Sequence, residues 1–169
     1  MTSSFKNSKK TNFLKTIPTA DIESYNDLLT ARCKFNFAYM DFSQQAGQRF
    51  DDWSKDQLSK LLNKFCEYSR ERLTYWQNQK IGPKKKNSVL EIYEKFPNIS
   101  DFKHPVNVPH QARWARFRLE NLMRLIGFVL PSDCHQKVHP KTGFCFDCNT
   151  FYVVFLLKFP KKSSCRHAK

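Results

Sequence analysis

The stretch RWARFRLENLMRLIGFVL at residues 113–130, followed by NTFYVVFLLKF at residues 149–159, decides the fold of this chain. It contains three runs, Arg113–Glu120, Leu122–Leu130 and Asn149–Phe159, all rich in the β-branched and aromatic residues that favour strands. Only Asn121 separates the first two runs, which predicts a tight antiparallel hairpin at that point. We therefore expect these runs to form a small antiparallel sheet.

The first run alternates in character, as a strand with one buried face does. One set of side chains is apolar: Ala115, Phe117 and Leu119. The other set is basic and aromatic: Trp114, Arg116 and Arg118. The sheet is therefore expected to have a core face and a basic face.

The residues before the sheet predict helices and one more strand. Ser54–Lys80 has apolar residues at helical spacing and starts with a capping box of Ser54 and Gln57. Shorter helices are expected over Ala20–Ala31 and Ser88–Lys95, and a strand buried on both faces over Cys33–Phe42. The expected fold class is α/β (α+β), with an N-terminal helix and strand and a long amphipathic helix packed on a small antiparallel sheet. The order of elements is βααβββ-like.

With 169 residues, the chain is long enough for one domain with its own core. We expect a flexible basic arm over residues 1–17 and a single α+β domain over residues 18–160. An inserted Cys/His loop occupies residues 131–148, and residues 161–169 form a basic tail.

The formal net charge of +14 points to an anionic partner. From Lys103 to Lys169, twelve Lys and Arg residues stand against three acids, a net of +9. Nucleic acid, with RNA favoured, is the first candidate partner and an acidic protein the second. A basic surface that serves only solubility is the alternative.

No apolar run reaches the eighteen residues of a membrane span, so no membrane partner is expected. The lysine-bearing N-terminus lacks the apolar core of a signal peptide, so a cytoplasmic location is expected. In that compartment the six cysteines are interpreted as free thiols or metal ligands rather than disulfides.

The basic face of the sheet is the candidate nucleic-acid surface. Arg116, Arg118 and Arg124 offer planar forks for phosphate, and Trp114 offers a stacking platform for a base. The alternative is an amphipathic edge strand whose arginines pair with helix carboxylates such as Glu67 and Glu71. Further candidate nucleic-acid contacts are Lys84, Lys85, Lys86 and Lys162, although a solvated loop also explains the first three.

The Cys/His loop carries Cys134, His135, His139, Cys145 and Cys148 within fifteen residues. Thiolates and imidazoles at such spacing can form a tetrahedral zinc site, for which the candidate ligands are Cys134, His139, Cys145 and Cys148. Reduced cysteines in a plain loop are the alternative. Structural zinc is the one candidate metal, and no cofactor is expected to be required.

The chain contains neither G-x-S-x-G nor H-E-x-x-H. The acids are too scattered to indicate a two-metal nuclease, although Asp41, Glu120 and Asp147 could converge. If the protein is catalytic, metal-independent RNA cleavage fits better, because it needs only a base for the 2′-hydroxyl, cations for the phosphorane and an acid for the leaving oxygen. Groups of these kinds are His104, His110, Tyr152, Lys158, Lys161 and the arginines.

The expected order of elements resembles the RelE/ParE toxin superfamily, whose small domains cleave mRNA or inhibit gyrase. The local likeness lies in RFRL at residues 116–119, in MRLIGF at residues 123–128, and in the ending FPKK at residues 159–162, which is similar to HigB-like members. The resemblance implies that Arg116, Arg118, Arg124, Lys158 and Lys161 bind and cleave RNA on the ribosome.

Three functions follow as hypotheses. The first is an mRNA endoribonuclease of a toxin–antitoxin or phage-defence system, with an acidic antitoxin as partner. The second is a non-catalytic RNA- or DNA-binding protein of a phage or mobile element. The third is an adaptor that docks an acidic partner protein through the same basic surface.

Overall fold

The computed structural model describes residues 7–17, 30–82, 86–119 and 123–158, and the chain divides into two compact units, Met1–Ala31 and Arg32–Lys169. The first unit contains helix α1 (Ser8–Thr16), so the arm predicted to be flexible includes a helix. The Asn7 side chain caps it by accepting a hydrogen bond from the Lys10 amide at 3.2 Å. Residues 20–29 of the helix predicted over Ala20–Ala31 lie outside the described residues. Within the described ranges, no helix is both long and apolar enough to span a bilayer.

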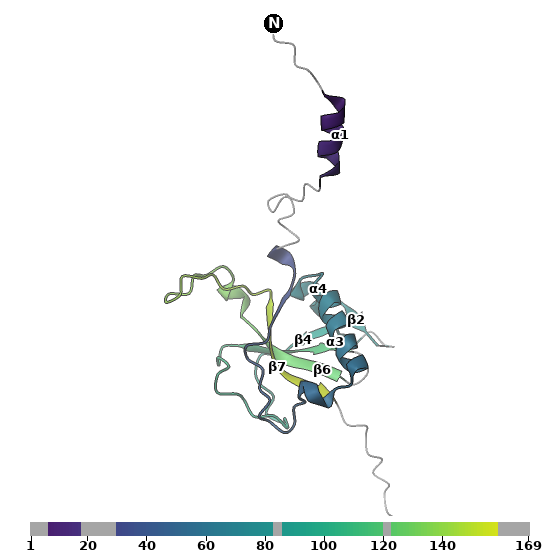
Figure 1. The fold of residues 1–169 in the computed structure, drawn as a ribbon. Helices are drawn as coiled ribbons and strands as arrows, with labels where there is room; N and C mark the ends of the chain where they lie inside the picture. The colour runs from purple at the N-terminus through teal and green to yellow at the C-terminus, as the bar shows by residue number, and fades with distance from the viewer. Residues whose placement is uncertain (1–6, 18–29, 83–85, 120–122, 159–169) are drawn as a thin grey trace, which may run out of the picture. The chain divides into compact units, whose positions relative to one another are not determined.

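The second unit is built on a mixed five-stranded sheet of order β1-β7-β6-β5-β4 (Figure 1). Its strands are β1 (Lys34–Asn36), β4 (Leu90–Ile92), β5 (Arg113–Arg118), β6 (Met123–Val129) and β7 (Thr150–Lys158). β1 runs parallel to β7, and every other pair in the sheet is antiparallel. The α+β class and the three strands predicted in the C-terminal half are confirmed, and the sheet gains an edge strand on each side.

The predicted long helix is two helices, α3 (Lys55–Tyr68) and α4 (Leu73–Asn78), so the prediction of one helix over Ser54–Lys80 is wrong. The capping box is confirmed, since Ser54 and Gln57 exchange backbone-to-side-chain hydrogen bonds. At the break, the Tyr68 carbonyl accepts hydrogen bonds from Trp76 Nε1 at 2.7 Å and from the Cys33 thiol at 3.3 Å. Tertiary contacts therefore use a carbonyl that a continuous helix would have bonded internally.

Two shorter predictions are also corrected. The strand expected over Cys33–Phe42 ends at Asn36, because the Asn36 side chain accepts a hydrogen bond from the Ala38 amide at 2.9 Å and turns the chain. The region Ser88–Lys95 is extended rather than helical. It contains β4, which pairs with the open edge of β5, and is preceded by β3 (Asn87–Ser88), which pairs with β2 (Lys80–Ile81).

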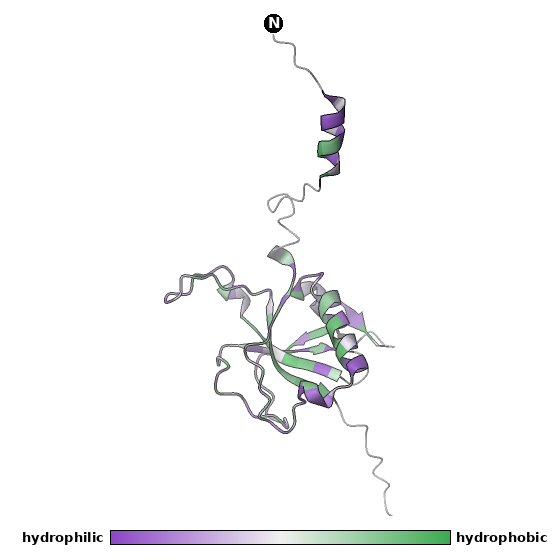
Figure 2. Ribbon diagram, in the orientation of Figure 1, coloured by the Kyte–Doolittle hydropathy of each residue, from purple (hydrophilic) through white to green (hydrophobic). Residues whose placement is uncertain are grey.

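The face of the sheet covered by α3 and α4 holds the larger core (Figure 1). Ala115, Phe117 and Leu119 point to this face, as their alternation predicted. Phe117 stacks on Tyr68 of α3 with ring centroids 4.8 Å apart and meets Phe151 of β7 edge-on at 5.0 Å. Figure 2 shows the corresponding apolar colouring along the strands and the polar outer side of the helices.

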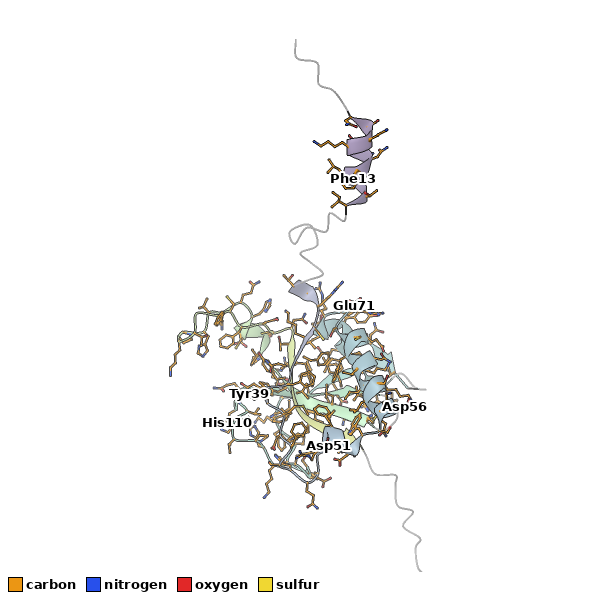
Figure 3. The ribbon with its side chains drawn as sticks, viewed as in Figure 1. Phe13, Tyr39, Asp51, Asp56, Glu71 and His110 are labelled. Atoms are coloured by element: carbon orange, nitrogen blue, oxygen red, sulfur yellow. The ribbon has the colours of Figure 1, made fainter. Side chains whose placement is uncertain are left out.

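The opposite face is covered by irregular chain, residues 37–50 and 93–112, with the 3-10 helix η1 (Phe50–Asp52) following the first segment. A second apolar cluster forms there, and Phe102 of the covering chain stacks on Phe155 of β7 at 4.2 Å. Figure 3 labels Tyr39 and His110 on the two covering segments, Asp56 in the first turn of α3, and Glu71 in the break between α3 and α4. Both faces of the sheet are therefore closed, one by helices and one by loops.

A β-bulge lies where β6 and β7 pair, because Ile126 faces Phe155 whereas Gly127 faces Val153. The extra residue is Val154, whose carbonyl accepts a hydrogen bond from the Asp41 amide at 3.0 Å in the covering chain. The bulge thus anchors the loop that closes the second face.

Candidate functional site

The loop-covered face changes from aromatic to cationic along its strands. The strand register defines three transverse rows of side chains, spaced roughly 7 Å apart. The aromatic row contains Tyr152, Phe128 and Trp114; the middle row contains Phe155, Ile126, Arg116 and Glu91; the cationic row contains Leu157, Arg124 and Arg118. Arg116 and Arg118, predicted on one face of a strand, and Arg124, predicted nearby on the next strand, are therefore brought together at one end of this face.

Glu91 of β4 holds two of these arginines. Its Oε2 accepts from Arg116 Nε at 3.1 Å and Nη2 at 2.7 Å, and from Arg118 Nη2 at 2.9 Å. The alternative that these arginines lie on an edge strand and pair with Glu67 and Glu71 is wrong. Glu67 pairs with a lysine of its own helix, and β5 is an interior strand. The expected type of contact, arginine with carboxylate, is present with a carboxylate of the neighbouring strand.

The cluster of Arg116, Arg118, Arg124 and Glu91 carries two more positive than negative charges. Burial alone would raise the pKa of Glu91, but the hydrogen bond and charge of Arg116, together with Arg118, hold that pKa below its ordinary value. Burial lowers the pKa of Arg124, and the charges of Arg118 and Arg116 lower it further. Because Arg118 and Arg124 are direct cross-strand partners, their like charges repel on a half-buried surface. An anion placed here would relieve that repulsion.

Arg116 keeps hydrogen-bonding capacity for a ligand. Glu91 engages its Nε and Nη2, and Nη1 has no hydrogen-bond partner within the described part of the chain. Its guanidinium carbon lies 5.5 Å from the centroid of the Tyr93 ring, within range of a cation–π contact. Burial raises the pKa of Tyr93 to about 12, so this phenol is protonated at neutral pH.

A pocket of about 220 Å³ opens beside these groups, between the sheet and the covering chain. Its lining includes Tyr93, Phe96, Ile99, Asp101, Arg116 and Arg124. The pocket therefore joins aromatic and aliphatic walls to two guanidinium groups, with one carboxylate among its other polar groups.

Trp114 does not offer the exposed stacking platform that its alternation predicted. It points to the predicted face but is only 2% exposed, with Phe96 at 4.7 Å and His104 at 5.4 Å between ring centroids. The covering chain closes over it, which the strand pattern alone could not reveal. Trp114 lines the pocket, so it is available as a wall of the pocket rather than as an exposed surface.

Other candidate catalytic residues lie apart from the arginines. Tyr152 is in the aromatic row, stacked on Phe128 at 4.8 Å, and burial followed by Tyr39 raises its pKa. His104 and His110 stack on each other at 5.5 Å in the covering chain. Lys158 ends β7 opposite Met123. Lys86 is exposed, whereas Lys84, Lys85, Lys161 and Lys162 lie outside the described residues.

The Cys/His loop brings two of its cysteines together at its base. The amide of Cys134 and the thiol of Cys148 both donate to the Pro131 carbonyl, each at 3.0 Å. The pKa of Cys148 is raised by burial first and by Cys134 second. Cys145 is exposed on the hairpin beyond, and His139 packs on Phe146. Across the described ranges no three potential ligands gather as a metal site would require, so zinc binding stays a prediction.

Glu91, Tyr93 and the pocket-lining residues 96–102 were missed from the sequence. The reason is the helix predicted over Ser88–Lys95, in which Glu91 would be an ordinary solvated acid. The missed signal is the alternation of Leu90 and Ile92 with Glu91 and Tyr93, which is typical of a strand. Comparison of the chain with protein-family models, with curated proteins and with solved structures finds no match.

Proposed function

We propose that this protein binds single-stranded RNA at the cationic end of the loop-covered face, through Arg116, Arg118 and Arg124. The observation that carries the proposal is the arginine cluster, in which Arg116 and Arg118 share the Glu91 carboxylate and Arg124 lies beside them, next to an aromatic-lined pocket. Phosphate groups neutralise such a cluster and release counterions, while aromatic side chains accept bases of any sequence. The formal charge of +14 favours the same partner.

The finer proposal is a metal-independent endoribonuclease that acts on mRNA in a toxin–antitoxin or phage-defence setting. Attack by a 2′-hydroxyl needs a base, cationic stabilisation and an acid. The pocket offers Arg116 and Arg124 as the cations and Tyr93 as the proton donor, and His104, which packs on Phe96 of the pocket lining, is the candidate base. An acidic antitoxin would inhibit by covering the same arginines.

The binding test uses a labelled mixed-sequence RNA oligonucleotide and fluorescence anisotropy over a salt series. Replacing Arg116 and Arg124 by Gln is expected to weaken binding and to reduce the salt slope by about 1.4, since each lost phosphate contact on a single strand removes about 0.7. The control is Arg113→Gln, because Arg113 bonds Glu94 on an exposed surface and does not line the pocket. Unchanged affinity and salt slope in a folded double variant would remove this face from the proposal.

The cleavage test follows RNA fragments in the presence of EDTA. A metal-independent enzyme is expected to retain its rate and to leave 2′,3′-cyclic phosphate ends, and Tyr93→Phe is expected to slow the reaction while leaving RNA affinity intact. Binding without cleavage would favour the non-catalytic RNA- or DNA-binding protein. Binding of an acidic protein but not of RNA would favour the adaptor.

A further inference from the structure

The pocket beside Arg116 and Arg124 has two chemically distinct parts. Tyr93 and Phe96 contribute aromatic walls, and the two arginines contribute donors that suit a phosphate or carboxylate. A ligand that satisfies both parts carries an apolar ring and an anion next to each other.

The size of the pocket restricts the ligand further. At about 220 Å³ it is smaller than the roughly 300–1,000 Å³ of sites that enclose drug-sized ligands. One planar ring system fits such a volume, with the attached anion at the open side. A folded peptide segment is too large.

The remaining polar groups select among the anions. Asp101 also lines the pocket, and its carboxylate accepts hydrogen bonds from amino groups on a nucleobase, which an acidic ligand with an apolar ring does not offer. The segment that follows β7 in the sequence contains Lys161, Lys162 and Arg166 without an acid, so its charge makes it a poor occupant of a site with two arginines. A nucleotide meets every requirement.

We propose that this pocket receives one unstacked nucleotide of a single-stranded RNA, with the base against Tyr93 and Phe96 and its phosphate on Arg116 and Arg124. The inference rests on the proposed RNA binding and adds a subsite to it. Asp101 accepts hydrogen bonds from the exocyclic amino groups of adenine, cytosine and guanine, whereas the only donor on the uracil base is its N3–H. The three amino-bearing bases are therefore expected to bind more tightly than uracil. The subsite therefore gives the RNA-binding surface a base preference that the arginines alone do not supply.

The test titrates the full chain with AMP, CMP, GMP and UMP by calorimetry, with ribose 5-phosphate as the ligand that lacks a base. Ile99→Asp places a negative charge in the pocket lining at a residue that is 98% exposed, so the fold is retained. It is expected to weaken binding of AMP about three- to fivefold, since the added charge acts on the phosphate through water. The matched control is Val106→Asp, since Val106 is fully exposed on the same covering chain and does not line the pocket. That control is expected to change the Kd for AMP less than twofold.

The base preference has its own readout. Asp101→Asn is expected to reduce the advantage of AMP, CMP and GMP over UMP, because an amide accepts fewer hydrogen bonds from the amino groups than a carboxylate does. Equal binding of ribose 5-phosphate and AMP, or equal effects of Ile99→Asp and Val106→Asp, would overturn the subsite. So would binding of a short acidic peptide with an aromatic residue in place of the mononucleotides.

The subsite and the proposed function fail in different ways. If Ile99→Asp leaves AMP binding unchanged while the Arg116 and Arg124 double variant loses RNA, the subsite is wrong and RNA binding stands. If AMP binds in the pocket but RNA oligonucleotides do not bind the protein, the proposed function is wrong and so is the assignment of the nucleotide to RNA.

Discussion

The two faces of the central sheet are built from the same strands but are closed in different ways. Against α3 and α4, side chains such as Phe117, Leu125 and Phe151 are fully buried among regular helices. On the other face, residues 37–50 and 93–112 close the aromatic row, and Arg116 and Arg124 line an open pocket. Helices offer continuous apolar stripes that fill space, whereas irregular chain leaves gaps that polar groups and ligands can enter.

The helix-covered face is expected to provide most of the stability, and the loop-covered face to provide ligand recognition. The helix-covered face contributes closely packed apolar area, and its residues are expected to dominate the free energy of unfolding. The loop-covered face holds like charges side by side at Arg118 and Arg124, an arrangement that costs stability but prepares the surface for an anion. Substitutions on the helix-covered face should therefore mainly lower stability, whereas substitutions on the loop-covered face should mainly change anion binding.

The largest effect is expected for Gly127→Ala. A Cβ at this position would lie 2.0 Å from the Tyr152 carbonyl oxygen and 2.8 Å from the Phe151 ring, which belongs to the helix-covered core. Overpacking against backbone should cost about 3 kcal/mol or more and remove most folded protein. The control is Gly143→Ala, where φ is +73° and the space is open, at a cost of about 1 kcal/mol. Urea unfolding measures both, and equal stabilities would show that the close approach at the bulge is unimportant.

Phe117→Ala and Phe102→Ala compare the two faces directly. Phe117 of β5 packs against Tyr68 of α3 and Phe151 of β7. Its replacement by Ala should leave a cavity and lower the free energy of unfolding by roughly 3–5 kcal/mol. Phe102 belongs to covering chain that can collapse toward the sheet, so its removal should cost about 2 kcal/mol. Chemical denaturation at one temperature gives the two differences. Equal costs would mean that the loop-covered face packs as rigidly as the other.

Glu91→Gln should lower stability but raise RNA affinity. The charged hydrogen bonds to Arg116 and Arg118 weaken, which should cost about 1–2 kcal/mol at pH 7 after allowance for the solvent exposure of Glu91. The arginine cluster gains one net positive charge, which favours binding of an anion. Thermal melts and RNA-binding anisotropy on the same preparation test whether stability falls while RNA affinity rises. A loss of both properties would mean that Glu91 positions the arginines for RNA.

The same variant carries a pH signature. The pKa of Glu91 is lower in the folded than in the unfolded chain, so its contribution is present above the unfolded pKa of about 4.3 and is lost as pH falls through the folded pKa. The stability difference between wild type and Glu91→Gln should therefore shrink between about pH 5 and pH 3. A difference that stays constant over that range would contradict the charge-based account.

The smallest effect is expected for Lys34→Met at the sheet edge, away from both faces. Lys34 bonds Asp147 at 2.5 Å, but the two side chains are 50% and 33% exposed. Water and salt weaken such a pair, so the loss should stay under about 1 kcal/mol and disappear at about 1 M salt. Melts at low and high salt check this, and a salt-independent loss would point to packing by the lysine stem instead.

The local residue pattern correctly predicted those helices and strands whose periodicity and capping residues indicate the same structure. The alternation of residues 113–119 gave both faces of β5, and the capping box at Ser54 gave the start of α3. It failed where one contact overrides local preference. The helix breaks after Tyr68 because Trp76 and Cys33 use its carbonyl, and residues 90–92 join the sheet because they pair with the side of β5 that β6 does not occupy. Neither contact can be read from neighbouring residues.

The α+β class, the strongly basic C-terminal half and the position of Arg116 and Arg118 on one face of a strand all follow from the amino-acid sequence alone. Hydrophobic periodicity and charge are local properties of the sequence, so they can be determined without knowledge of the fold. The burial of Trp114, the bonds from Arg116 and Arg118 to Glu91 and the pocket beside them become visible only in the folded chain. These depend on contacts between residues such as Glu91 and Arg116, which are 25 positions apart and meet only when the strands pair.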